Sequence, residues 1–161
     1  HVTGVQTCAL PISQHPSESD EYLVARLLAY LLEYEEGITF SRGVSEPEEP
    51  TIAVRDLTGV IRTWIEIGTP DATRLHKASK SGARVAVYCH KEGAQWLKGL
   101  AAAGIHKADA LQLFALDRSL IAQLVSRLDR RMSFSVSISD REFYISIGND
   151  NLTGTVEPLQ I

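Results

Sequence analysis

Glu49 and Glu66 are the residues whose type and spacing favour chemistry most clearly. They lie on either side of residues 56–59 (DLTG), a favourable four-residue turn, so the flanking segments are expected to pair as an antiparallel hairpin. With that turn at its centre, Glu66 faces Glu49 and Trp64 faces Thr51. Two facing carboxylates can bind Mg²⁺, which takes one or two carboxylates together with phosphate oxygens and water. The pattern therefore predicts a magnesium site, with Mn²⁺ as the alternative ion, suited to cleaving a phosphodiester.

The apolar residues of this hairpin indicate how deeply Glu66 is placed. Side chains alternate across a strand, and the expected core face carries Ile52, Val54, Ile61, Ile65 and Ile67. Glu66 lies on the other face between two of these isoleucines, so it is expected to be partly buried, and a buried carboxylate needs a cation or a proton. Asp56 is interpreted as a turn residue, because at strand rise it is roughly 20 Å from the point opposite Glu66.

Two further side chains are candidates for supporting the reaction. Glu21 shares a helical face with apolar residues and is expected to point toward the sheet, where it would support a second ion or orient water. The alternative is an ordinary first-turn acid favoured by the helix dipole. Lys77 lies in the helix after Glu66 and would stabilise phosphate charge, or it is simply part of a basic helix end. The predicted catalytic residues are thus Glu21, Glu49, Glu66 and Lys77, with Glu49 and Glu66 as metal ligands.

Other reactive residue types form no recognisable site. No P-loop, dinucleotide-binding fingerprint, serine-nucleophile elbow or zinc pattern occurs in the sequence. The histidines lack metal-ligand spacing and are interpreted as structural or surface residues: His15, His76, His90 and His106. Cys89 ends an apolar strand and is interpreted as a buried, inert thiol.

Helices and strands alternate along most of the chain. Helices are predicted over residues 17–34, 69–82, 92–103 and 117–128, the second with Thr69 as its N-cap and Pro70 at its first position. Strands are predicted over residues 38–42, 51–56, 60–68, 84–89, 110–116, 133–139, 142–147 and 152–156. This order predicts an α/β (α+β) fold, in which helices flank a mixed sheet that ends in an antiparallel β-meander.

Composition sets the broad class of the protein. The 161 residues suffice for one domain, with 44% hydrophobic and 22% charged residues. No apolar stretch approaches the length needed to span a bilayer, and two cysteines cannot build a disulfide framework, so a cytoplasmic protein without membrane contact is expected. The net charge of −4 disfavours a nucleic-acid coat protein but allows a local basic patch. Oligomeric state is left open.

The first twelve residues differ from the rest of the chain. Residues 2–12 (VTGVQTCALPI) carry no charge and match, codon for codon, a translation of a common short-read sequencing adapter. We interpret residues 1–12 as an artefact and residues 13–161 as the single domain, so that Cys8 is not a cysteine of this protein. A natural disordered N-terminus is the alternative.

Two segments resemble a known family. Residues 15–30 (HPSESDEYLVARLLAY) and residues 55–79 (RDLTGVIRTWIEIGTPDATRLHKAS) closely resemble the YaeQ family of small bacterial proteins. With VAVY at residues 85–88 and the β-rich tail, the resemblance covers residues 13–161. The family is similar in fold to the PD-(D/E)XK nuclease superfamily, so the resemblance implies a restriction-endonuclease-like sheet.

The same resemblance implies roles for individual residues. It puts Glu66 at the acidic position of the (D/E)-x-K element, residues 49–51 at the P-D element and Glu21 at the helix carboxylate. Two positions depart from the superfamily pattern. Thr51 follows Pro50 where an acid is expected, so that Glu49 or Glu48 must substitute. Gly68 stands at the lysine position, so that Lys77 would have to serve from the helix.

The resemblance also bears on the N-terminus and leaves two functions open. The family carries a β-hairpin before the H-P-S-E segment, and residues 1–12 stand in its place. The β-meander is therefore expected to have an unpaired edge, and the chain to be unstable or to aggregate. One interpretation is a Mg²⁺-dependent nuclease or phosphodiesterase. The other is a catalytically inactive member that binds nucleic acid or a protein partner through the same cleft.

Overall fold

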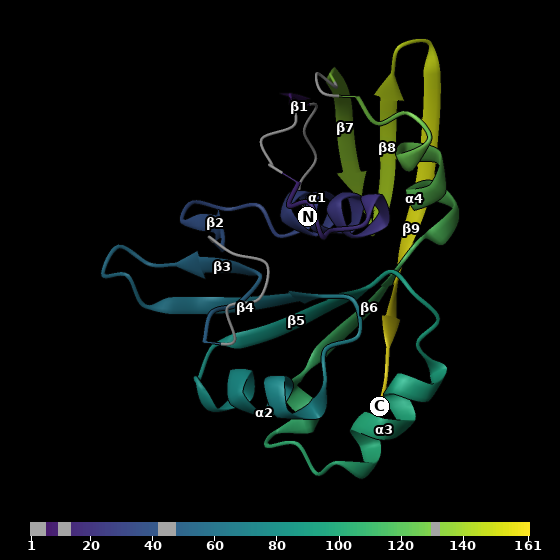
Figure 1. The fold of residues 1–161 in the computed structure, drawn as a ribbon. Coiled ribbons are helices and arrows are strands. Elements are labelled where there is room, and N and C mark those ends of the chain that lie inside the picture. The colour runs from purple at the N-terminus through teal and green to yellow at the C-terminus, as the bar shows by residue number, and fades with distance from the viewer. Residues whose placement is uncertain (1–5, 10–13, 42–47, 130–132) are drawn as a thin grey trace.

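Nine strands and four α-helices follow one another in a computed structural model that describes residues 6–9, 14–41, 48–129 and 133–161 (Figure 1). The helices are α1 (Asp20–Leu32), α2 (Ala72–Lys80), α3 (Ala94–Ala102) and α4 (Arg118–Val125), with a 3₁₀ turn at Ala108–Ala110. The strands are β1 (Gln6–Ala9), β2 (Ile38–Phe40), β3 (Ile52–Arg55), β4 (Ile61–Ile67), β5 (Arg84–Cys89), β6 (Gln112–Leu116), β7 (Ser133–Ser139), β8 (Glu142–Ile147) and β9 (Asp150–Leu159).

The strands form one mixed sheet in the order β1-β7-β8-β9-β6-β5-β4-β3-β2. β4, β5 and β6 are parallel neighbours, and the antiparallel strands extend the sheet on both sides. Because β4 and β5 run in the same direction, their carboxyl ends meet at one edge of the sheet. The predicted mixed sheet with a C-terminal β-meander is confirmed. None of the described helices is both long and apolar enough to cross a membrane.

The two faces of the sheet are covered by different helices, as Figure 1 shows for α1 on one side and α2 with α3 on the other. Ile52, Val54, Ile65 and Ile67 pack with the apolar residues of α1 and α4, which confirms the predicted core face for these four residues. Ile61, the fifth, lies near the turn, is only partly buried and stays outside this cluster. Trp64 faces the other way and packs in the smaller cluster with residues of α2 and α3.

Local sequence signals explain most element boundaries. Ser19 caps α1 by accepting a hydrogen bond from the Tyr22 amide, and the predicted β7–β8 hairpin turns through two residues with positive φ, Asp140 and Arg141. The predicted start of α2 is wrong. Asp71, and not Thr69, is the N-cap residue, and its carboxylate accepts from the Arg74 amide at 2.8 Å.

The predicted register of the β3–β4 hairpin is also wrong. Ile52 pairs with Ile65, and continuing this register places Thr51, and not Glu49, opposite Glu66. Two irregularities cause the difference. The amide of Asp56 donates to the Val60 carbonyl, so the turn is one residue longer than predicted and includes Val60. A bulge between Val54 and Arg55 then shifts the pairing again. These irregularities displace the pairing by two residues.

The turn residue itself behaves as predicted. The Asp56 carboxylate accepts hydrogen bonds from the amides of Thr58 and Val60, at 2.9 and 3.1 Å, and pairs with Arg62 at 2.8 Å. These hydrogen bonds, those with Thr58 first, lower the pKa of Asp56 to about 2. Asp56 therefore stabilises the hairpin tip and takes no part in the site.

The edge of the β-meander differs from the prediction as well. Gln6–Ala9 pair antiparallel with residues 133–136 of β7, so the prediction of an unpaired edge along that part of β7 is wrong. A strand pairs through its backbone, and an uncharged segment without a clear period can therefore still complete a sheet edge. The interpretation of residues 1–12 as adapter-derived stays a prediction.

Candidate functional site

A cleft of about 450 Å³ opens where β4 and β5 end. The carboxyl ends of parallel strands are where ligands bind in open α/β sheets. The cleft is bordered by residues of α1 on one side and of α2 on the other, and it is lined by Tyr22, Thr51, Glu66, Ile67, Gly68, Thr69, Pro70, Arg74, His90 and Lys91.

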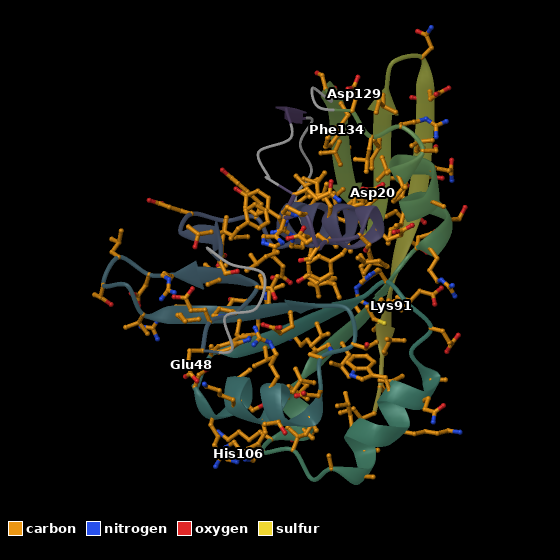
Figure 2. The ribbon with its side chains drawn as sticks, in the orientation of Figure 1. Asp20, Glu48, Lys91, His106, Asp129 and Phe134 are labelled. Carbon is orange, nitrogen blue, oxygen red and sulfur yellow. The ribbon has the colours of Figure 1, made fainter. Side chains whose placement is uncertain are left out.

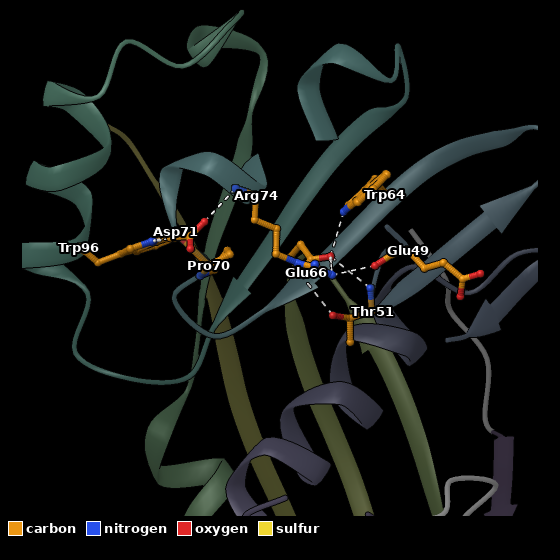
Figure 3. Close-up of polar contacts among 8 residues, drawn as sticks. All are labelled: Glu49, Thr51, Trp64, Glu66, Pro70, Asp71, Arg74 and Trp96. Atoms are coloured by element: carbon orange, nitrogen blue, oxygen red, sulfur yellow. Dashed lines mark hydrogen bonds and ion pairs between the residues drawn. The ribbon is translucent and has the colours of Figure 1, made fainter. Parts of the chain in front are cut away.

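Glu66 is the one carboxylate among the lining residues, and it is buried, with only 3% of its surface exposed. Strand alternation puts Trp64 on the same face, and its indole Nε1 donates to Glu66 Oε2 at 2.8 Å (Figure 3). The observed register brings Thr51 opposite Glu66, so that the Thr51 amide donates to Oε2 at 3.1 Å and its hydroxyl to Oε1 at 3.3 Å. The carboxylate is thus well supplied with donors.

Arg74 provides the countercharge for Glu66. Its Nε donates to Oε1 at 2.5 Å and its Nη2 to Oε2 at 3.1 Å, a bidentate arrangement in the first turn of α2 (Figure 3). The same Nη2 donates to the backbone carbonyl of Glu49 at 2.7 Å. Burial lowers the pKa of the guanidinium, but the hydrogen bonds and charge of Glu66 outweigh it and raise that pKa above its ordinary value. A permanent cation therefore sits at the carboxylate.

This arrangement does not fit a divalent ion. Both oxygens of Glu66 already accept hydrogen bonds, and a metal ion would have to displace the guanidinium of Arg74. Glu49 reaches the cluster through its backbone carbonyl, whereas the carboxylate of Glu49 points away from Glu66 (Figure 3). In the described part of the chain, no group of three or more His, Cys, Asp or Glu residues could hold a metal.

The other two predicted site residues lie outside the cleft lining. Lys77 is half-exposed and forms an ion pair with Glu48. Figure 2 shows Glu48 well away from Lys91, which lines the cleft. Glu21 is exposed on α1, although its charge acts on the imidazole of His90. Of Glu21, Glu49, Glu66 and Lys77, the structure therefore brings only Glu66 into the cleft with its side chain.

His90 is a cleft residue that the sequence interpretation left as structural or surface. It follows β5 directly, and its ring packs edge-on against Tyr22 with 6.1 Å between the ring centroids. Only 7% of its surface is exposed, and among the described residues its Nδ1 has no hydrogen-bond partner. Burial and, to a smaller extent, the charge of Lys91 lower the pKa of His90 to about 4, against an opposing effect of Glu21. The imidazole is therefore neutral near pH 7.

Arg74, Tyr22 and Lys91 were also missed as site residues. Arg74 could have been found from its place three residues after Asp71, in the turn of α2 nearest the end of β4. Lys91 could have been found because it follows the end of β5 at the same edge of the sheet. Tyr22 interacts with Thr51 across the cleft, and burial raises the pKa of its hydroxyl, a relation that only the tertiary structure reveals.

Fold and cleft together define the class of protein: a mixed α/β domain with a ligand-sized cleft at the carboxyl ends of two parallel strands. Comparison with known families gives the particular one. The sequence model described as "YaeQ protein" matches residues 3–156, and the chain belongs to the YaeQ family.

Relatives and solved structures agree with this assignment. The chain is 33% identical over 146 residues to "Uncharacterized protein YaeQ" of Salmonella typhi, and 32% identical over the same length to that of Escherichia coli K12, in both cases covering 89% of this chain and 80% of the relative. The crystal structure of YaeQ from Xanthomonas axonopodis pv. citri superposes with a TM-score of 0.82 at 30% identity, covering 99% of each chain. YaeQ from Pseudomonas syringae has the same fold, with a TM-score of 0.83 at 23% identity over 99% of this chain and 97% of the other.

Proposed function

We propose that this protein binds nucleic acid through the cleft by contacts to phosphate, and that it does so without a metal ion at Glu66. The observation that carries the proposal is the Glu66–Arg74 pair, in which the guanidinium takes the acceptors that a metal ion would need. The proposal keeps the nuclease-type scaffold that the family resemblance implies and replaces metal chemistry at its centre with binding.

Charge supports phosphate as the ligand group. The chain as a whole carries a net charge of −4, whereas the cleft is lined by two cationic side chains and a single carboxylate. Arg74 neutralises that carboxylate, which leaves the ammonium of Lys91 with no ion pair among the described residues. Hydroxyl groups of Thr69 and Tyr22 add uncharged donors of the kind that contact phosphate oxygens.

The experiment is a binding titration with fluorescent oligonucleotides in EDTA. Single-stranded and duplex DNA and RNA are compared, first for the natural chain and then for Lys91→Glu. Lys98→Glu is the matched control, because Lys98 is an exposed lysine of α3 outside the cleft lining. The proposal predicts salt-sensitive binding that Lys91→Glu weakens and Lys98→Glu does not. Absence of binding, or equal effects of the two charge reversals, would overturn it and favour a protein partner.

The second candidate function is Mg²⁺-dependent cleavage of a phosphodiester. The observation in its favour is the place of Glu66, at the carboxyl end of β4 in a cleft that also contains the lysine Lys91. This candidate requires Arg74 to release the carboxylate. The test is incubation of labelled DNA and RNA with Mg²⁺ or Mn²⁺. Cleavage that is lost in Glu66→Gln would contradict the binding proposal and support this second function. The binding proposal predicts no cleavage.

A further inference from the structure

One polar atom in the cleft has no partner within the described part of the chain. The Nδ1 of His90 is buried, and no described group is within hydrogen-bonding reach of it. A buried polar atom left unsatisfied costs about 1–3 kcal/mol, so such atoms are uncommon and call for an explanation. A ligand that supplies the missing hydrogen bond is a direct explanation, because the residue lines the cleft.

Gly68 lies beside this atom. A Cβ at Gly68 would lie 3.5 Å from His90 Cε1 and 3.9 Å from Nδ1, so any side chain there would lie against the same edge of the imidazole. Gly68 has a φ of +91°, a conformation that side chains other than glycine adopt only with strain. The same residue thus lets the chain turn and places no side chain of its own against the Nδ1 edge of the ring, which is nevertheless buried.

Lys91 brings a charge to the same corner of the cleft. It follows His90 in the chain, it is exposed, and it forms no ion pair with the residues that the structure describes. A neutral imidazole beside an ammonium offers a hydrogen-bonding group and a positive charge to one ligand group. An acidic oxygen suits this pair, because it can bind both the ammonium and the ring nitrogen.

We propose that His90 and Lys91 form a subsite for a phosphate monoester, the group that ends a phosphorylated nucleic-acid strand or a free nucleotide. This inference rests on the proposed function and names the part of the ligand that the cleft holds. The cleft volume of about 450 Å³ falls in the range of sites for single small ligands, so it suits a chain end better than a long duplex. A monoester also carries more negative charge than the diester inside a strand.

Binding at this subsite is expected to raise the pKa of the imidazole. The groups that face His90 are Glu21 and Tyr22 from α1 and Lys91 from its own segment, whereas Gly68, which follows β4, has no titratable group. A bound phosphate adds negative charge beside the ring and favours the protonated imidazole. The pKa of His90, about 4 in the free protein, is therefore expected to rise when the monoester binds.

The test follows the ring proton of His90 by NMR during pH titrations of the intact chain. One titration uses the free protein, and the others contain a 5′-phosphorylated oligonucleotide, the same strand with a 5′-hydroxyl, or a nucleoside monophosphate. The expected result is a rise in the His90 titration midpoint with the phosphorylated ligands alone. We also expect His90→Gln and Lys91→Ala each to bind the phosphorylated strand about tenfold more weakly, because each loses one hydrogen bond to a charged group. His106→Gln is the matched control at an exposed histidine, with no expected effect.

The outcomes separate this inference from the proposed function. Equal binding of the phosphorylated and unphosphorylated strands, with an unchanged His90 midpoint, overturns the subsite and leaves nucleic-acid binding in place. A shifted midpoint with the monophosphate and no binding of any strand supports the subsite and contradicts the proposed function. Because the NMR titration uses the unaltered chain, the inference stays testable even if His90→Gln fails to fold.

Discussion

Removing Arg74 is the perturbation whose effect follows most directly from the structure. Arg74→Ala leaves the carboxylate of Glu66 buried, 3% exposed, without its countercharge. Breaking a buried ion pair from one side costs about 3–5 kcal/mol, because the remaining charge is uncompensated. Trp64 and Thr51 still donate to Glu66, and the Arg74 side chain is 25% exposed, so we expect the lower end, about 3 kcal/mol.

Neutralising Glu66 instead of removing Arg74 is expected to lower the free energy of unfolding by less. In Glu66→Gln, the guanidinium of Arg74 keeps its bond to the Glu49 carbonyl and can also reach water, so about 1–2 kcal/mol is expected. The double variant Arg74→Ala/Glu66→Gln removes both charges and should be more stable than Arg74→Ala alone. Urea unfolding followed by circular dichroism measures all three variants. Equal losses for the two single variants, or a loss below about 0.5 kcal/mol for Arg74→Ala, would refute the reasoning.

Three further predictions concern the metal, the packing and the pH dependence. Mn²⁺ should raise the melting temperature of Arg74→Ala and not that of the natural chain, because only the variant frees Glu66; equal shifts would contradict this. Gly154→Ala should lose about 1–3 kcal/mol in urea unfolding, since a Cβ there would lie 2.5 Å from Leu120 Cδ2; an unchanged stability would show that Leu120 moves aside. Because the pKa of His90 is lowered to about 4, the unfolded chain binds the extra proton, and stability should fall by up to about 3 kcal/mol as pH drops from about 6.5 to about 4. His90→Gln should flatten that part of the profile, and a profile that keeps its slope would contradict the assignment.

Much of the fold was accessible from local sequence patterns. The alternation of β7 and β8 and the pair Asp140-Arg141 predict that hairpin at its observed bounds, because period and turn agree. The core face of the β3–β4 hairpin was also correct, since an error of two residues in the pairing leaves every side chain on its own face. The same error, however, moves Glu49 away from the point opposite Glu66.

The site was less accessible because it depends on small displacements. Sequence does not reveal that the turn includes Val60 or that a bulge follows Val54, and these features exchange Glu49 for Thr51. The start of α2 at Ala72 places Arg74 in the turn next to Glu66 and leaves Lys77 one turn farther along, where it pairs with Glu48.

The measurement that tests the central claim most directly is the affinity for one oligonucleotide, compared with and without Mg²⁺. A 5′-phosphorylated oligonucleotide is titrated into the natural chain by calorimetry, once in EDTA and once in Mg²⁺. Because Arg74 occupies the carboxylate of Glu66, we predict that Mg²⁺ does not strengthen binding beyond its screening of phosphate charge, and that the strand is not cleaved. Binding or cleavage that appears only with Mg²⁺ would contradict the claim and show that the cleft functions as a metal site.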